Sequence, residues 1–301
     1  MRALPLIVSF FALSNGFVEK YPAGLPPPVP LDTKHTPLSR IVGGTDTTIT
    51  KWPFVVSLQY EWDDFEWKTL HFCVGTILNK DWILTSGNCY DTLVYANCTV
   101  RAGSDHFHMN GTVHRIDTVV RHPQYGEFNS DYDVALIKLN TSLEFSDSIQ
   151  PVTLPEVNVT YPVGTFFSMP SWGAPRLFDD ITLRLQEIDV PTISFDLCKT
   201  VYGEAVTERM FCSYYRPGDD AFGMCVGDTG APAVVDGVVI GIASWHYACS
   251  SPGYPNVYAN LPLMVDWITE IIGSSSAATA TPIFGLTVSF VILGYFLGRL
   301  D

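Results

Sequence analysis

The sequence predicts an all-β fold, and three features of the chain indicate it. Short apolar runs of β-strand length, rich in β-branched residues, recur between turn residues from about residue 41 to about residue 260. The chain also contains 23 Gly and 21 Pro, spread along its length, which favour many turns. Regular spacing of such runs is typical of a β-sandwich or a β-barrel. The clearest runs are residues 54–60, 76–78, 82–85, 113–120 and 134–139.

A helix is expected where this β-rich region ends. Met264, Ile268 and Ile271 lie at helical spacing, and Gly273 follows them as a stop signal. We interpret the apolar stripe as the face that docks on the body of the protein.

Composition limits the class of protein and its partners. The chain has 301 residues, of which 47% are hydrophobic and only 16% charged, so it is long and apolar enough to fold around a large core. Its formal net charge of −14 repels phosphate backbones, so we expect no nucleic-acid partner.

The first forty residues indicate export. Residues 1–16 have a basic start, an apolar stretch, and the small residues Ser14 and Gly16 at the last positions before a cleavage point, as in a secretory signal peptide. Residues 17–40 are rich in Pro, favour an extended chain, and read as a propeptide that ends at Arg40.

The last segment, residues 273–301, indicates membrane attachment. A small polar stretch, residues 274–281, is followed by residues 282–298, which carry no charge. This order is typical of a lipid-anchor (GPI) signal, and a single transmembrane span is the alternative. Either reading places the folded part on the extracellular face of the plasma membrane, or secreted.

The cysteines and the glycosylation sequons also indicate an exported protein. Seven cysteines suggest three disulfides with one cysteine left over. Four Asn-X-Ser/Thr sequons predict N-glycosylation, at Asn97, Asn110, Asn140 and Asn158.

Several short motifs then follow one another in a fixed order. They are Ile41-Val-Gly-Gly44, His71-Phe-Cys73, Leu84-Thr-Ser-Gly-Asn-Cys89, Asp133-Val-Ala-Leu-Ile-Lys-Leu139, Gly227-Asp-Thr-Gly-Ala-Pro232, Ser244-Trp245 and Pro255-Asn-Val-Tyr258. With these motifs, residues 41–272 resemble the trypsin/chymotrypsin family of serine proteases. The resemblance implies two packed six-stranded antiparallel β-barrels of the chymotrypsin-like type, a cleft between them and a C-terminal helix.

The resemblance also implies the disulfide pairing. The pairs are Cys73–Cys89, Cys198–Cys212 and Cys225–Cys249. Cys98 is left over, either as a buried free thiol or as a cysteine that pairs with another chain.

The catalytic positions of that family are degenerate in this sequence. Its chemistry needs a hydroxyl nucleophile, an imidazole base and an orienting carboxylate. The carboxylate is present as Asp133, whereas Asn88 stands at the histidine position and Thr229 at the serine position. A carboxamide has no nitrogen that titrates near neutral pH, so Asn88 cannot act as a general base. We expect Asn88 and Ser244 to donate hydrogen bonds to Asp133 instead.

The specificity pocket of the family is altered as well. By resemblance its floor is Gly223 and its wall includes Ser244 and Trp245, while His246 and Asn256 replace the glycines that normally keep the entrance open. These two side chains are expected to project into the space that a substrate would enter. Among the histidines we expect only His246 to lie near the cleft. His106 and His108 are interpreted as solvated loop residues, and we expect no metal and no cofactor.

The activation machinery of the family matches this chain. A trypsin-like protease would cut between Arg40 and Ile41, and the new ammonium group of Ile41 would pair with Asp228. Gly227 and Thr229 would supply the main-chain N–H groups of the oxyanion hole.

From these residues we expect a protein that is not an enzyme. The expected function is that of a non-catalytic serine protease homologue, tethered to the membrane, that binds an unidentified extracellular protein. The alternative is a weakly active serine-type endopeptidase that uses Thr229 as its nucleophile.

Overall fold

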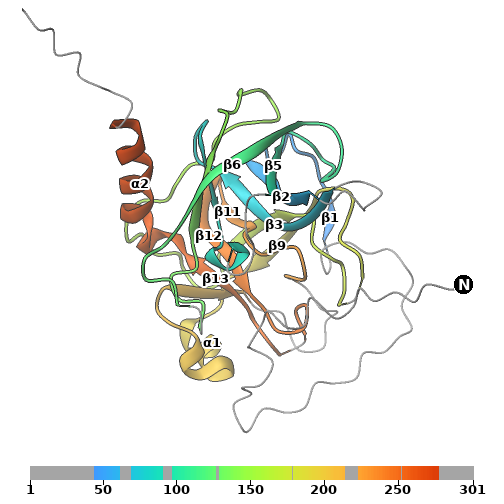
Figure 1. Ribbon diagram of the computed structural model, residues 1–301. Helices are drawn as coiled ribbons and strands as arrows, with labels where there is room; N and C mark the ends of the chain where they lie inside the picture. The colour runs from blue at the N-terminus through green and yellow to red at the C-terminus, as the bar shows by residue number, and fades with distance from the viewer. Residues whose placement is uncertain are drawn as a thin grey trace, which may run out of the picture.

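The computed structural model describes residues 44–61, 69–90, 97–126, 129–177, 179–213, 223–251 and 253–277. The predicted signal peptide, the propeptide with Arg40, and Ile41 lie outside the described residues, as does the tail from residue 278 onward. Two β units make up most of the described chain (Figure 1).

The first β unit is a closed barrel with the strand order β2-β3-β4-β7-β6-β5. Every run that the sequence singled out forms part of one of its strands, because β-branched side chains fill the barrel interior; Val56 and Ile83, for example, are fully buried and both lie against Gly75 of β3. The strands are β2 (Val55–Glu61), β3 (Thr69–Ile77), β4 (Trp82–Thr85), β5 (Cys98–Ala102), β6 (Thr112–Arg121) and β7 (Ala135–Leu139).

The second β unit is an antiparallel sheet with the order β1-β9-β8-β11-β12-β13-β10. The all-β prediction is confirmed, although this unit is a seven-stranded sheet that does not close within the described residues. The additional strand is the two-residue β1, in which Thr45 pairs with Glu187 of β9. The strands are β1 (Thr45–Asp46), β8 (Phe166–Ser171), β9 (Gln186–Pro191), β10 (Met210–Ser213), β11 (Pro232–Val235), β12 (Val238–Trp245) and β13 (Asn256–Asn260).

The helices agree only partly with the prediction. The predicted C-terminal helix is α2 (Val265–Ala277), but it continues past Gly273, where the sequence predicted its end. A glycine that ends a helix adopts a positive φ, and Gly273 does not have a positive φ. The sequence analysis did not predict α1 (Phe195–Tyr202), which begins where the Ser194 hydroxyl accepts the N–H of Leu197.

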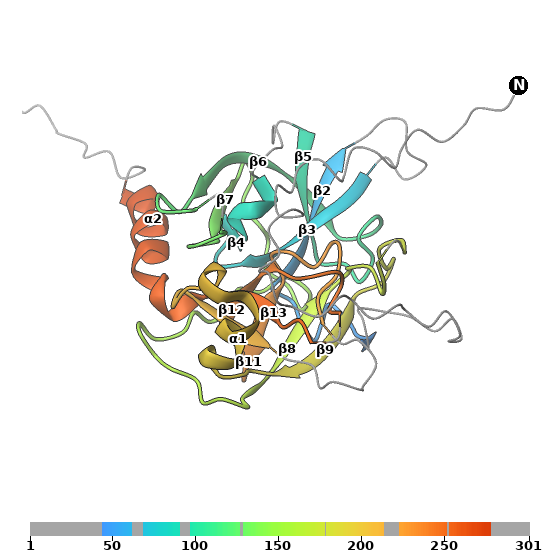
Figure 2. The same cartoon turned by 90° about the horizontal axis from the view of Figure 1, so that it is seen from below.

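The two units lie on opposite sides of the molecule in Figure 2, with α1 beside the second unit and α2 at the edge. Short 3₁₀ turns join elements of the described chain, among them η2 (Gly87–Tyr90), η4 (Gly203–Ala205) and η5 (Leu261–Leu263). One core of buried side chains runs through both units.

The three predicted disulfides are confirmed. They are Cys73–Cys89, Cys198–Cys212 and Cys225–Cys249. Cys98 is a free, buried thiol on β5, and burial raises its pKa to about 11. None of the helices in the described ranges is both long and apolar enough to cross a bilayer.

Candidate active site

Asp133 lies at the centre of the candidate site, just before β7. Its carboxylate is buried and accepts hydrogen bonds from the Ser86 hydroxyl at 2.8 Å, the Ser244 hydroxyl at 2.5 Å and the main-chain N–H of Asn88 at 2.8 Å, and also from the main-chain N–H of Gly87. Burial raises the pKa of this carboxyl, and the hydrogen bonds offset part of that rise. The group is therefore a buried acid whose oxygens are well satisfied by donors.

The donors differ from the sequence prediction in one respect. Ser244 donates to Asp133 as expected, but Asn88 does so through its main chain, at the start of the turn η2. Sequence reasoning missed Ser86, whose hydroxyl lies within hydrogen-bonding distance of both carboxylate oxygens of Asp133. The available signal was its place in the same short motif as Asn88, two residues earlier.

The loop that carries Thr229 is fixed to both β units. The main-chain oxygen of Thr229 accepts the N–H of Val74 on β3 at 2.8 Å, and the N–H of Gly230 donates to Ala243 on β12 at 2.8 Å. Gly230 has a φ of +86°, and a Cβ on it would lie 2.1 Å from the Val74 oxygen. Only glycine fits there, so the loop can keep the partly buried Thr229 in one place.

A histidine that the sequence analysis did not place near this loop contacts it directly. The Nε2 of His71, on β3, lies 2.9 Å from the main-chain oxygen of Gly227, and its Nδ1 lies 2.8 Å from the Ser57 hydroxyl. Our prediction that only His246 lies near the site is therefore wrong. Burial lowers the pKa of His71 to about 4, so the ring is neutral at pH 7.

Asp228, beside Thr229, is fully buried. Its two carboxylate oxygens accept the main-chain N–H groups of Gly173 at 3.0 Å and Cys225 at 2.7 Å. Burial raises the pKa of this carboxyl to about 7, although the hydrogen bonds, including one from Ser171, act in the opposite direction.

Two of the predicted pocket residues meet in the second β unit. Gly223 and Asn256 are in contact, and both are buried. Trp245 packs edge to face on Tyr202 of α1, with ring centroids 4.7 Å apart. His246 is partly buried, and its Nδ1 accepts the N–H of Cys249 at 3.2 Å.

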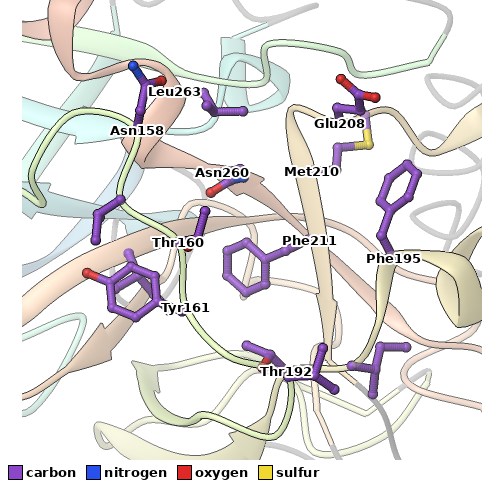
Figure 3. Close-up of a pocket in the computed structure, with 14 residues that line it drawn as sticks. Asn158, Thr160, Tyr161, Thr192, Phe195, Glu208, Met210, Phe211, Asn260 and Leu263 are labelled. Carbon is purple, nitrogen blue, oxygen red and sulfur yellow. The ribbon is translucent and has the colours of Figure 1, made fainter.

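A separate pocket of about 320 Å³ lies elsewhere on the second β unit (Figure 3). None of the residues that line it belongs to the predicted catalytic or specificity positions. Its lining is largely apolar and includes Tyr161, Phe195, Met210, Phe211 and Leu263.

All four predicted glycosylation residues are exposed. Each of them therefore meets the steric requirement for an attached glycan. These residues are Asn97, Asn110, Asn140 and Asn158.

Comparison with known proteins identifies this arrangement. The family model described as "Trypsin" matches residues 41–268. The chain is 35% identical to "Trypsin 5G1" of Aedes aegypti, over 78% of this chain and 85% of that protein. It is 31% identical to "Trypsin" of Phaedon cochleariae, over 78% of this chain and 89% of that one. It is 32% identical to "Trypsin-2" of Salmo salar, over 78% and 96% of the respective chains.

These matches overturn one of our predictions. We expected a protein that is not an enzyme, because Asn88 and Thr229 replace the family's base and nucleophile. The relatives of this chain are named as trypsins, and the matches span nearly all of the folded part, so that prediction is wrong. Since the family model covers residues 41–268 and relatives above 30% identity align over most of both chains, this chain belongs to the trypsin family.

Proposed function

We propose that the chain is an extracellular endopeptidase with a low turnover rate. It binds an extended polypeptide between its two β units and cleaves it with the hydroxyl of Thr229. The observation that carries this proposal is the position of Thr229, which lies on a loop fixed to β3 and β12 by main-chain hydrogen bonds. The orienting carboxylate of the family, Asp133, supports it as a second feature that this chain keeps.

The rate is low because the site has no imidazole at position 88. In the proposed step the Thr229 oxygen attacks the peptide carbonyl, its proton passes to solvent, and the amine leaves with a proton from water. Water then hydrolyses the threonyl ester. Loss of the base in such a triad costs about 10⁶ in rate, while oxyanion donors and substrate binding keep about 10³–10⁴ over the uncatalysed reaction. We propose Gly227 and Thr229 as these main-chain donors.

Slow turnover means that a bound polypeptide leaves the site at its own dissociation rate, in most encounters before it is cleaved. The proposed function therefore includes reversible binding of an extracellular protein as well as its cleavage.

We propose that activation follows the family's scheme. A trypsin-like protease cuts after Arg40, and the ammonium group of Ile41 then joins Asp228. Two features support this proposal: Asp228 is buried, and its pKa of about 7 allows ionisation once a positive charge lies beside it.

We also propose export and attachment to the cell surface. The signal-like residues 1–16 and the exposed sequon asparagines support the export of a glycosylated protein. Attachment through residues 273–301 rests on their sequence pattern alone. Phosphatidylinositol-specific phospholipase C should release the protein from intact cells, and retention with a C-terminal epitope would point to a spanning helix instead.

The enzymatic proposal is tested with purified protein cut after Arg40. It is incubated with a mixture of peptides, and new termini are counted over hours by mass spectrometry. The wild-type protein should generate products slowly, and Thr229→Ala should reduce the rate to background. Equal rates for both proteins would contradict the proposal, because the cleavage would not depend on the Thr229 hydroxyl. Labelling by a fluorophosphonate that requires Thr229 gives a second readout.

A further inference from the structure

The space beside Gly223 is filled by two polar side chains from another part of the second β unit. A Cβ built on Gly223 would lie 2.1 Å from Nδ2 of Asn256 and 2.7 Å from the hydroxyl of Ser250. Asn256, at the start of β13, and Ser250, before it, are each 1% exposed. Asn256 and Ser250 therefore occupy the volume that a side chain at position 223 would need.

Ser250 holds the Asn256 amide in this space. The Ser250 hydroxyl lies 2.9 Å from Oδ1 of Asn256 and 2.8 Å from the main-chain oxygen of Met224, next to Gly223. The hydroxyl has one proton, so it donates to one of these two oxygens at a time, and it lies between Asn256 and the segment of Met224. Sequence reasoning singled out Asn256 but not Ser250, because only the fold brings residues 223, 250 and 256 together.

The backbone keeps Ser250 turned inward. Three consecutive residues that are not glycine, Ala248, Cys249 and Ser250, have φ values of +43°, +52° and +59°. Such values are uncommon for residues with a side chain and persist only where the surroundings fix them. Here the Cys225–Cys249 disulfide ties this turn to the segment that follows Met224.

The filled space is uncharged and small. Asn256 and Ser250 carry no charge, and burial lowers the pKa of nearby His246 to about 4, so its ring is neutral at pH 7. Asn256, Ser250 and His246 therefore offer no negative charge that could pair with a lysine or arginine side chain of a substrate. A large aromatic side chain would have to displace the buried Asn256.

From this arrangement we infer that Asn256, positioned by Ser250, restricts the site to polypeptides with glycine or alanine on the amino side of the cleaved bond. The inference rests on the proposed function, since it names the substrate class of the same site. The physical reason is volume: pockets distinguish substrates that differ by one methylene about 10-fold to 200-fold, and a side chain longer than alanine needs space that Asn256 holds.

The first experiment does not depend on catalysis. Binding of phenol and of indole to the full-length protein is measured by ligand-observed NMR for the wild type and for Asn256→Gly. The variant opens the space, so it should bind both rings at least about tenfold more tightly than the wild type. Asn140→Gly is the matched control, because it makes the same change at an exposed residue just after β7, in the first β unit, and should leave binding at the wild-type level.

The second experiment measures specificity. Peptides that differ only in alanine or phenylalanine before the cleaved bond are compared by mass spectrometry. The wild type should favour alanine at least about 100-fold, and Asn256→Gly should reduce that ratio at least about tenfold. Ser250→Ala, which keeps Asn256 but removes its hydrogen-bonding partner, should lower the ratio to an intermediate value, and it serves as the second variant if Asn256→Gly does not fold.

The outcomes separate this inference from the proposed function. If no variant cleaves any peptide while Asn256→Gly gains ring binding, the endopeptidase proposal fails and the filled pocket stands. If the wild type binds phenol and indole as tightly as Asn256→Gly, or cleaves phenylalanine peptides as fast as alanine peptides, the inference is overturned.

Discussion

The Nε2 of His71 lies 2.9 Å from the main-chain oxygen of Gly227, two residues before Thr229. Since the Ser57 hydroxyl lies 2.8 Å from the other ring nitrogen, the neutral ring with a proton on Nε2 satisfies both contacts. Gln59 in turn donates to the Ser57 hydroxyl at 3.1 Å. A chain of polar side chains from the first barrel thus reaches the loop of the candidate nucleophile.

This buried histidine predicts an acid-sensitive fold. The folded pKa of His71 is about 4, against an ordinary value of 6.5, so between these pH values the unfolded chain binds a proton that the folded protein does not. The stability from this group is complete above pH 6.5 and falls as the pH drops toward 4, by about 3 kcal/mol in total. Urea unfolding of the wild type and of His71→Gln should show a stability difference that shrinks by about 2 kcal/mol between pH 7 and pH 5. Parallel pH curves for the two proteins would contradict the assignment.

Gly173 is expected to tolerate no side chain. A Cβ on this residue would lie 2.0 Å from a carboxylate oxygen of Asp228, which is buried and hydrogen-bonded to the same glycine. Gly173→Ala should therefore lower the free energy of unfolding by about 1–3 kcal/mol or more and disturb the loop of Thr229. Gly273→Ala is the control: no atom lies within 4 Å of its added Cβ, and in helix α2 the change should be neutral or slightly stabilising. Equal stability of the two variants in thermal unfolding would refute the packing argument.

Asp228 predicts a pH effect that cleavage after Arg40 should reverse. Its folded pKa of about 7 lies above the ordinary value of 3.8, so the folded protein keeps a proton that the unfolded chain loses between these values. Stability from this group is complete below pH 3.8 and falls as the pH rises toward 7. Relative to Asp228→Asn, the uncut protein should lose about 2 kcal/mol between pH 5 and pH 7. After cleavage the Ile41 ammonium favours the ionised form of the Asp228 carboxyl, and this loss of stability should disappear.

Identical pH dependence of stability before and after cleavage would exclude the proposed pairing of Ile41 with Asp228. The effect is opposite in sign to that of His71, so each residue needs its own variant.

Much of the fold could be predicted because it depends on local patterns. The strands of the first barrel follow runs of β-branched residues, and the disulfide pairing is the one that the family resemblance implies. Helix α1 was missed because it has only eight residues and Cys198 is its only fully buried one, which leaves little periodic signal.

The contacts of the candidate site were harder to predict. Ser86 and Asp133 are 47 positions apart, and Ser250 reaches Met224 across 26 positions, so their hydrogen bonds exist only once the chain has folded. His71 appeared in the sequence only as part of a strand motif. Sequence reasoning could predict which residues stand at the catalytic positions, whereas the hydrogen-bonding partners of those residues depend on tertiary contacts.

The last prediction concerns rebuilding the triad, and Ser86 changes how this should be done. Asn88→His with Thr229→Ser supplies a base and a nucleophile, but the new imidazole must compete with the Ser86 hydroxyl, which lies 2.8 Å from both oxygens of Asp133. Adding Ser86→Ala frees the carboxylate to orient the ring. We expect the triple variant to cleave alanine peptides faster than the double variant, and both to exceed the wild type, with an upper limit of about 10⁶-fold or about 8 kcal/mol of barrier.

The choice of substrate makes this prediction selective. Peptides with arginine or phenylalanine before the cleaved bond should show little gain in the triple variant, because Asn256 still fills the space beside Gly223. Adding Asn256→Gly should raise cleavage of phenylalanine peptides by much more than it does in the wild-type background, since hydrolysis needs both a working triad and a carbonyl within about 3–3.5 Å of the hydroxyl. The measurement is kcat/KM for alanine and phenylalanine peptides in each background, with Thr229→Ala as the blank. Rapid cleavage of phenylalanine peptides by the triple variant, without Asn256→Gly, would show that Asn256 does not limit substrate entry. If no rebuilt variant cleaves alanine peptides, features other than the triad separate this site from an efficient protease.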